Sequence, residues 1–66
     1  MHIKSQPTFP DIRVKQGYSV TALAKAMNVS PATVLGIEKG RSINPATAKK
    51  ACETLRMTFD ELFTIK

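Results

Sequence analysis

Apolar residues recur along the chain at the spacing of amphipathic helices. The clearest stretch places Val20, Leu23, Ala24 and Met27 at positions i, i+3, i+4 and i+7, so that all four side chains share one helical face. No stretch alternates apolar and polar residues for long enough to suggest a strand, and we therefore predict an all-α fold. The 66 residues suffice for one small domain, which we expect to contain five short helices.

Residues that start and stop helices divide the chain into these five segments. Ser30-Pro31 and Asn44-Pro45 each combine an N-cap residue with a proline suited to the first helical turn, and Thr58 with Glu61 has the spacing of a capping box. The expected elements are a first helix over residues 10–16, a second from Val20 to a turn at Asn28, a third from Pro31 to about Lys39, a fourth that begins at Pro45 and a short fifth after Thr58.

Residues 1–8 show no periodicity, and we predict a flexible N-terminal arm there. The domain itself is expected over residues 9–66. Its core should collect the apolar faces of the five helices. The residues expected to point inward are Phe9, Ile12, Val14, Val20, Leu23, Ala24, Met27, Val29, Val34, Ile37, Ala48, Ala51, Cys52, Leu55, Phe59, Leu62 and Phe63.

Positive charge is concentrated in the middle of the chain. The whole sequence has ten Lys and Arg against five Asp and Glu, a net charge of +5. Between Ile12 and Lys50 the only acidic residue is Glu38, whereas the basic residues there include Lys25, Lys39 and Arg41. A polyanion such as nucleic acid is the natural partner of such a surface, although a basic, solvated surface without a partner would look the same.

The sequence offers few residues that could form a catalytic or metal-binding site. His2 stands alone in the expected arm, Cys52 falls on the buried face of the fourth helix, and no His, Cys, Asp and Glu residues cluster at metal-ligand spacing. We therefore expect no enzyme activity, no cofactor and no metal. The single cysteine, the lack of a membrane-length apolar run and the lack of a signal peptide predict a cytoplasmic protein that does not insert into membranes.

The second and third helices, about residues 20–39, form the most informative pair. They are joined by Asn28-Val29-Ser30 within the pattern L-A-x-x-M-N-V-S-x-x-T-V-x-x-I-E-x-G, which begins at Leu23. This pattern resembles the Xre-type family of phage repressors and Cro proteins, and the similarity extends from Phe9 to Phe63. The resemblance implies a lambda-repressor-like DNA-binding domain with a central helix-turn-helix, which binds operator DNA, usually as a symmetric dimer.

The resemblance also assigns roles to individual residues. It implies an ion pair between Arg13 and Glu38 that joins the first and third helices, a structural pair rather than a DNA contact; the alternative is two independent surface charges. The residues that would face the bases are Pro31, Ala32, Thr33, Leu35 and Gly36. Those that would contact phosphates are Ser19, Val20, Thr21, Lys39, Arg41, Ile43, Asn44, Ala46 and Thr47.

The base-facing set departs from the pattern of many family members, which place Gln, Arg, Lys or Asn there. Methyl contacts to thymine by Ala32 and Thr33, together with DNA shape, would then supply specificity. Two functions follow. The first is a sequence-specific transcriptional regulator, repressor or Cro-like, that occludes a promoter. The second is a protein-interaction module of the same fold, an anti-repressor, modulator or antitoxin-like protein that binds a larger DNA-binding partner.

The oligomeric state follows from the small size of the domain. A dimer would have to form through the DNA-binding domain itself, by way of Phe59, Leu62, Phe63 or Ile65. We expect a weak homodimer that is formed or stabilised on double-stranded DNA.

Overall fold

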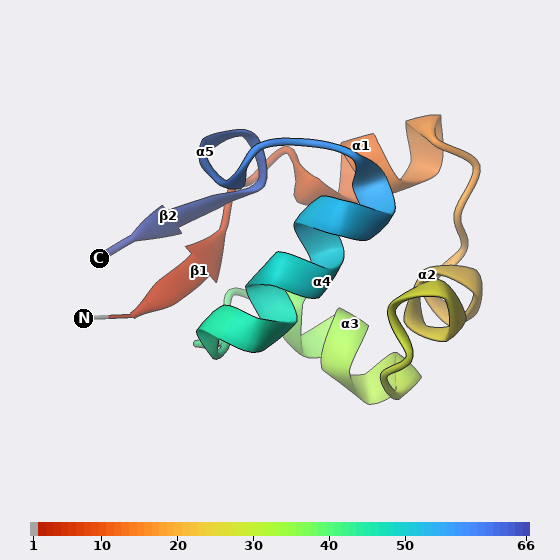
Figure 1. Cartoon of the computed structure of the whole chain (residues 1–66), viewed down its shortest axis with the longest axis horizontal. Helices are drawn as coiled ribbons and strands as arrows, with labels where there is room; N and C mark the ends of the chain where they lie inside the picture. Colours follow the sequence, from red (N-terminus) through yellow and green to blue (C-terminus); the bar gives the residue numbers. More distant parts are fainter. Residues whose placement is uncertain (1) are drawn as a thin grey trace.

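Five helices and two short strands make up the fold (Figure 1). The computed structural model describes residues 2–66, so Met1 of the expected arm lies outside the described residues. The elements are β1 (Ile3–Ser5), α1 (Phe9–Lys15), α2 (Val20–Met27), α3 (Pro31–Glu38), α4 (Pro45–Leu55), α5 (Phe59–Leu62) and β2 (Phe63–Ile65). The prediction of a small, all-α, lambda-repressor-like fold with five helices is confirmed, with a small sheet in addition.

Local capping explains where four of the helices begin. The side chains of Ser19, Ser30, Asn44 and Thr58 each accept a hydrogen bond from the backbone N–H three residues later. Each bond satisfies a donor that has no partner inside its own helix. Helix α1 begins at Phe9, one residue earlier than predicted, and its N-cap residue Thr8 makes no side-chain bond. These short-range interactions are the reason that the sequence predicted most helix starts correctly.

The N-terminal segment is a strand, not the expected loose arm. β1 pairs antiparallel with β2, with Ile3 opposite Ile65 and Ser5 opposite Phe63. The backbone of His2 exchanges two hydrogen bonds of 2.8 Å with that of Lys66. Figure 1 shows the two strands side by side at one end of the molecule, with α2 at the other. The prediction of no strand was wrong because three-residue strands are too short to show an alternating pattern, and their partners lie about sixty residues apart.

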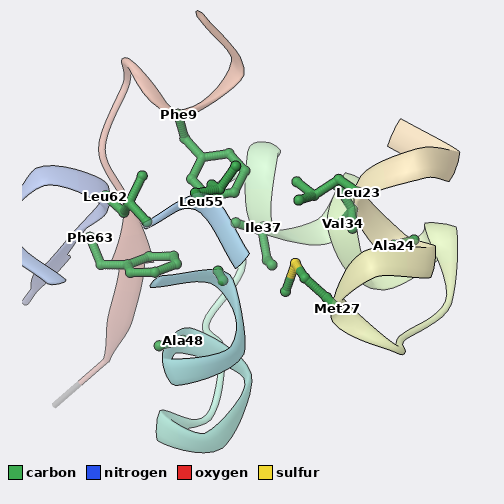
Figure 2. Packing of buried hydrophobic residues seen from close by; sticks show 11 residues of the cluster. Phe9, Leu23, Ala24, Met27, Val34, Ile37, Ala48, Leu55, Leu62 and Phe63 are labelled. Carbon is green, nitrogen blue, oxygen red and sulfur yellow. The ribbon is translucent and has the colours of Figure 1, made fainter. Parts of the chain in front are cut away.

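The core contains side chains from all five helices and from β2. Figure 2 shows the aromatic rings of Phe9 and Phe63, from opposite ends of the sequence, turned toward the same interior as Leu55. Val14 was expected inside but is 63% exposed, because the short α1 buries a narrower face than predicted. The core residues are Phe9, Leu23, Ala24, Met27, Val34, Ile37, Ala48, Ala51, Leu55, Leu62 and Phe63, with Ile12, Val20, Val29, Cys52 and Phe59 partly buried against them.

The capping box of α5 lowers the pKa of Glu61. The Glu61 carboxylate accepts hydrogen bonds from the backbone N–H of Thr58, at 3.0 Å, and from its hydroxyl, at 2.9 Å. These bonds favour the charged carboxylate, so its pKa is lower in the folded protein than in the unfolded chain. The stabilisation is therefore present above the unfolded-state pKa and is lost as the pH falls through the folded-state pKa.

Replacing Thr58 with alanine tests this capping box. We expect the variant Thr58→Ala to raise the pKa of Glu61, because one of its two donors, the hydroxyl, is removed. An NMR titration of the Glu61 carboxyl carbon measures the change directly. Asp60 lies beside Glu61 but outside the box, and its titration serves as the internal control. An unchanged Glu61 pKa would show that the box does not form in solution.

Candidate nucleic-acid interface

A tight turn joins α2 to α3 and fixes the angle between them. Asn28 adopts a left-handed backbone conformation, with φ of 60°, and this allows the N–H of Val29 to donate to the carbonyl of Ala24 at 2.9 Å. The chain bends by 112° between the two helices, within the range of a DNA-binding helix-turn-helix. Ala24 is 1% exposed, and its small side chain suits a close approach between helices.

The same two helices are short and largely apolar. Within residues 2–66, no single helix is both long and apolar enough to cross a membrane. α2 and α3 reach the required length and composition only when taken together, across their 112° bend.

Helix α3 has a buried face and an outer face of small, uncharged side chains. Val34 and Ile37 are fully buried, whereas Pro31 and Ala32 are exposed and Leu35 is 43% exposed. Thr33 is partly buried, and its hydroxyl lies 3.1 Å from the hydroxyl of Ser30. The helix therefore presents methyl and methylene groups, with no charged or amide side chain from Pro31 to Ile37.

Gly36 does not join this outer face, which corrects its expected base-facing role. It is buried, and a Cβ added to it would lie 3.4 Å from Cδ of Arg41. The side chain of Arg41 therefore lies between Gly36 and the solvent.

Two helix N-termini were expected to offer backbone N–H groups to phosphates. At α2, Ser19 and Thr21 are exposed and Val20 is partly buried, and the Ser19 hydroxyl accepts from the N–H of Ala22 at 3.0 Å. The N–H groups of Val20 and Thr21 lie in the first turn, where no intrahelical acceptor is available. A phosphate contact by these two amides stays a prediction.

The start of α4 matches that expectation only in part. The N–H of Ile43 donates to the carbonyl of Ile3 at 3.0 Å, and the N–H of Thr47 donates to Oδ1 of Asn44 at 2.8 Å. Both amides are therefore engaged within the protein, and the expectation that they contact phosphate through the backbone is corrected. Ala46 is exposed, and its first-turn N–H is left without an intrahelical acceptor.

A cleft of about 400 Å³ separates α3 from the start of α4. Its lining includes Ala32 and Thr33 on one side, Asn44 and Thr47 on the other, and Arg41. Arg41 is the only charged residue in this lining, and Lys39 is exposed at the end of α3. The cleft thus combines a basic group, small apolar groups and the start of α4.

β1 holds the loop that carries Arg41, a role that sequence reasoning missed. The ring of His2 hydrogen bonds to the hydroxyl of Ser42 at 2.6 Å, and the Ser5 hydroxyl donates to the carbonyl of Ile37 at 2.6 Å. With the bond between Ile3 and Ile43, three contacts join β1 to the end of α3 and the following loop. No local sequence signal could have revealed them, since each joins residues more than thirty positions apart.

The crossing angle, the turn and the exposed outer face of α3 are those of a helix-turn-helix. Over residues 11–62 the chain matches the family model described as helix-turn-helix. The chain belongs to the Xre-type helix-turn-helix family. A DNA-binding regulatory function follows from this membership. No curated protein matches the sequence. The predicted resemblance to the family is therefore confirmed.

The Arg13–Glu38 pair implied by this Xre-type resemblance is present in the structure. Nε of Arg13 donates to Oε2 of Glu38 at 2.5 Å, and Nη1 donates to the carbonyl of Tyr18 at 2.8 Å. Both charged side chains are only 14% exposed. The pair joins α1 to the end of α3 and so fixes the position of the helix that carries the residues predicted to face the bases.

Metal-ligating side chains and Cys52 are the remaining candidate groups of this Xre-type domain. In the part of the chain that the structure describes, no three His, Cys, Asp or Glu side chains could together hold a metal ion. Cys52 is half-buried, and this burial raises the pKa of its thiol. The neutral thiol is the less reactive form, in keeping with a packing role against the core.

Proposed function

We propose that this Xre-type domain is a sequence-specific repressor that occludes a promoter by binding in the major groove of DNA. The supporting observation is the outer face of α3, which is exposed, uncharged and followed by Lys39 and Arg41. The first residues of α3 would meet base edges, and the two basic side chains would meet phosphates. The proposed site of action is the cytoplasm.

Specificity in this proposal comes from methyl contacts and DNA shape. Ala32 and Leu35 are exposed on α3 and offer only apolar atoms, which suit the methyl group of thymine. The hydroxyl of Thr33 is already bonded to Ser30, so its methyl group is the freer part of that side chain. Pro31 fixes the backbone of the first turn of α3, and its exposed ring adds apolar surface to the outer face of the helix. Such a helix favours sites with thymine and with easily deformed steps.

Dimer formation in this proposal uses the end of β2. Leu62 and Phe63 were expected to contribute, but they are 0% and 1% exposed and serve the core. Ile65 is 53% exposed on β2, and Phe59 is partly buried nearby in the sequence. A contact centred on Ile65 would be small, in keeping with a homodimer that forms on a two-half-site operator. The half-sites would lie about one helical turn apart, roughly 34–36 Å.

Two single substitutions test which residues of the proposed interface contact phosphates and which contact bases. We expect Lys39→Ala to weaken binding to all sequences similarly and to reduce the slope of log affinity against log salt by about 1. We expect Thr33→Ala to alter the preferred sequence and leave the salt slope unchanged, since Thr33 would contact a base. Binding to selected and random duplexes across a salt series measures both effects.

The matched control is Lys15→Ala, which removes an equal charge far from the cleft. Lys15 adjoins Gln16, whose side-chain amide donates to the carbonyl of Leu55 at the opposite end of α4. This variant should keep the salt slope of the unmodified protein. Equal losses for Lys15→Ala and Lys39→Ala would show that the interface lies elsewhere.

The second candidate function is a protein-interaction module that binds a larger DNA-binding partner. It is favoured by Leu35, a large apolar side chain that is 43% exposed on a helix without charged groups. An exposed leucine on an uncharged helix face also suits a protein contact. Absence of DNA binding at low salt would reject the repressor proposal in favour of this one.

A further inference from the structure

The start of the loop after α3 is folded back onto that helix by its own backbone. Gly40 has a φ of +81°, and its N–H donates to the carbonyl of Ile37 at 3.1 Å. The N–H of Arg41 donates to the carbonyl of Gly36 at 3.0 Å. These two bonds form a Schellman motif, which ends the helix and returns the chain along its side. Arg41 is thereby brought level with Gly36, one and a half turns back along α3.

The side chain of Arg41 then lies against the bare backbone of Gly36. A Cβ at Gly36 would be 3.4 Å from Cδ of Arg41, a close contact that the exposed side chain of Arg41 would relieve by moving a few tenths of an ångström. Gly36 is buried although it lines the cleft between α3 and α4. The missing side chain therefore provides the space in which the methylene groups of Arg41 rest.

Among residues 2–66, no acidic side chain forms an ion pair with Arg41. The salt bridge found among residues 2–66 joins Arg13 to Glu38 and does not involve Arg41. No acidic residue lines the cleft, where the other polar groups belong to Thr33, Ser42, Asn44 and Thr47. A guanidinium on such a surface favours an anionic ligand.

We propose that Gly36 is a positioning residue, which acts through Arg41 to set the grip on one DNA phosphate at the cleft between α3 and α4. This inference rests on the proposed DNA-binding function. It replaces a base-reading role for Gly36 with a role in directing a neighbouring side chain. The chain combines a glycine that is poor for helix stability with an arginine whose Cδ packs beside that glycine.

The variant Gly36→Ala separates these two consequences. Gly36 lies within α3 at a backbone conformation open to alanine, so the added methyl group should raise the melting temperature of the free protein. The same methyl group should displace the side chain of Arg41. We therefore expect a more stable protein that binds its selected DNA roughly three- to tenfold more weakly, with a salt slope lower by about 1.

A double-substitution cycle identifies the route of the effect. If Gly36 acts through Arg41, then Gly36→Ala should cause no further loss of DNA affinity in an Arg41→Ala background. In the free protein, an NMR nuclear Overhauser effect between the α protons of Gly36 and the δ protons of Arg41 should report their packing. This measurement needs no DNA.

The outcomes distinguish this proposal from the function on which it rests. Normal DNA binding by Gly36→Ala would overturn the positioning role and leave the repressor proposal intact. A changed sequence preference that persists in the Arg41→Ala background would also overturn it, in favour of a direct base contact. Failure of the unmodified protein to bind any DNA would overturn the proposed function, and the positioning role with it, even where the packing is observed.

Discussion

Replacing Phe63 with alanine is expected to remove a large part of the protein's free energy of unfolding. Phe63 is 1% exposed, and its ring lies 5.8 Å from that of Phe9 and 5.6 Å from that of Phe59, measured between centroids. Removing a buried phenylalanine side chain costs about 3–5 kcal/mol. The free energy of unfolding of a domain this small is roughly 3–10 kcal/mol, so the loss is a large part of the total. Urea denaturation followed by far-UV circular dichroism measures it.

Two further variants serve as controls for the volume and the burial of the Phe63 ring. Phe63→Leu keeps most of the apolar volume and should cost less than about 2 kcal/mol. Phe59→Ala removes an equally large ring that is only partly buried, and its cost should lie below that of Phe63→Ala. A Phe63→Ala variant as stable as Phe59→Ala would show that β2 does not pack on the core in solution.

Removing the carboxylate of Glu38 is the second large effect. In Glu38→Ala the Arg13 guanidinium, 14% exposed beside its partner, loses its counter-charge and keeps only the carbonyl of Tyr18. A partly buried charge left without a partner should lower the free energy of unfolding by about 2–4 kcal/mol. Chemical denaturation of Glu38→Ala, Arg13→Met and the double variant forms a cycle that isolates the energy of the pair.

The double variant is the decisive member of this cycle. Because neither charge is then left stranded, it should regain stability relative to Glu38→Ala. Its folded form should still bind DNA with an unchanged salt slope, since the pair is structural. Simple addition of the two single losses would mean that Arg13 and Glu38 do not interact, and a changed salt slope would mean that Arg13 meets DNA.

The helices could be predicted because their determinants are local. The side chains of Ser30 and Asn44 each accept a hydrogen bond from the backbone N–H only three residues later. The turn at Asn28 depends on the backbone conformation of that residue alone. β1 could not be predicted in this way. Its bonds reach Lys66 and Ile43, so the information that orders it lies in the tertiary structure and not in the segment itself.

In the candidate site, too, local features could be predicted and features set by long-range contacts could not. The exposure of Pro31, Ala32 and Leu35 followed from helical periodicity and from the resemblance to the family. The burial of Gly36 did not, since it depends on how Arg41 folds back after the helix has ended. The resemblance to the family implied a phosphate contact at Ile43, whereas the amide of Ile43 donates to Ile3, in a segment expected to have no structure. Family resemblance thus predicted a binding surface on α3, and long-range contacts decide which of its backbone atoms are already bonded within the protein.

The antiparallel pairing of β1 with β2 has a consequence for how the protein folds. Helices and their turns form between neighbours in sequence, whereas the sheet must close a loop of about sixty residues, which costs chain entropy before any contact is made. We infer that the sheet assembles last and opens first. The loop with Arg41 is held by His2 and Ile3, so a molecule with every helix in place would still lack a fixed position for this loop until its two ends had met.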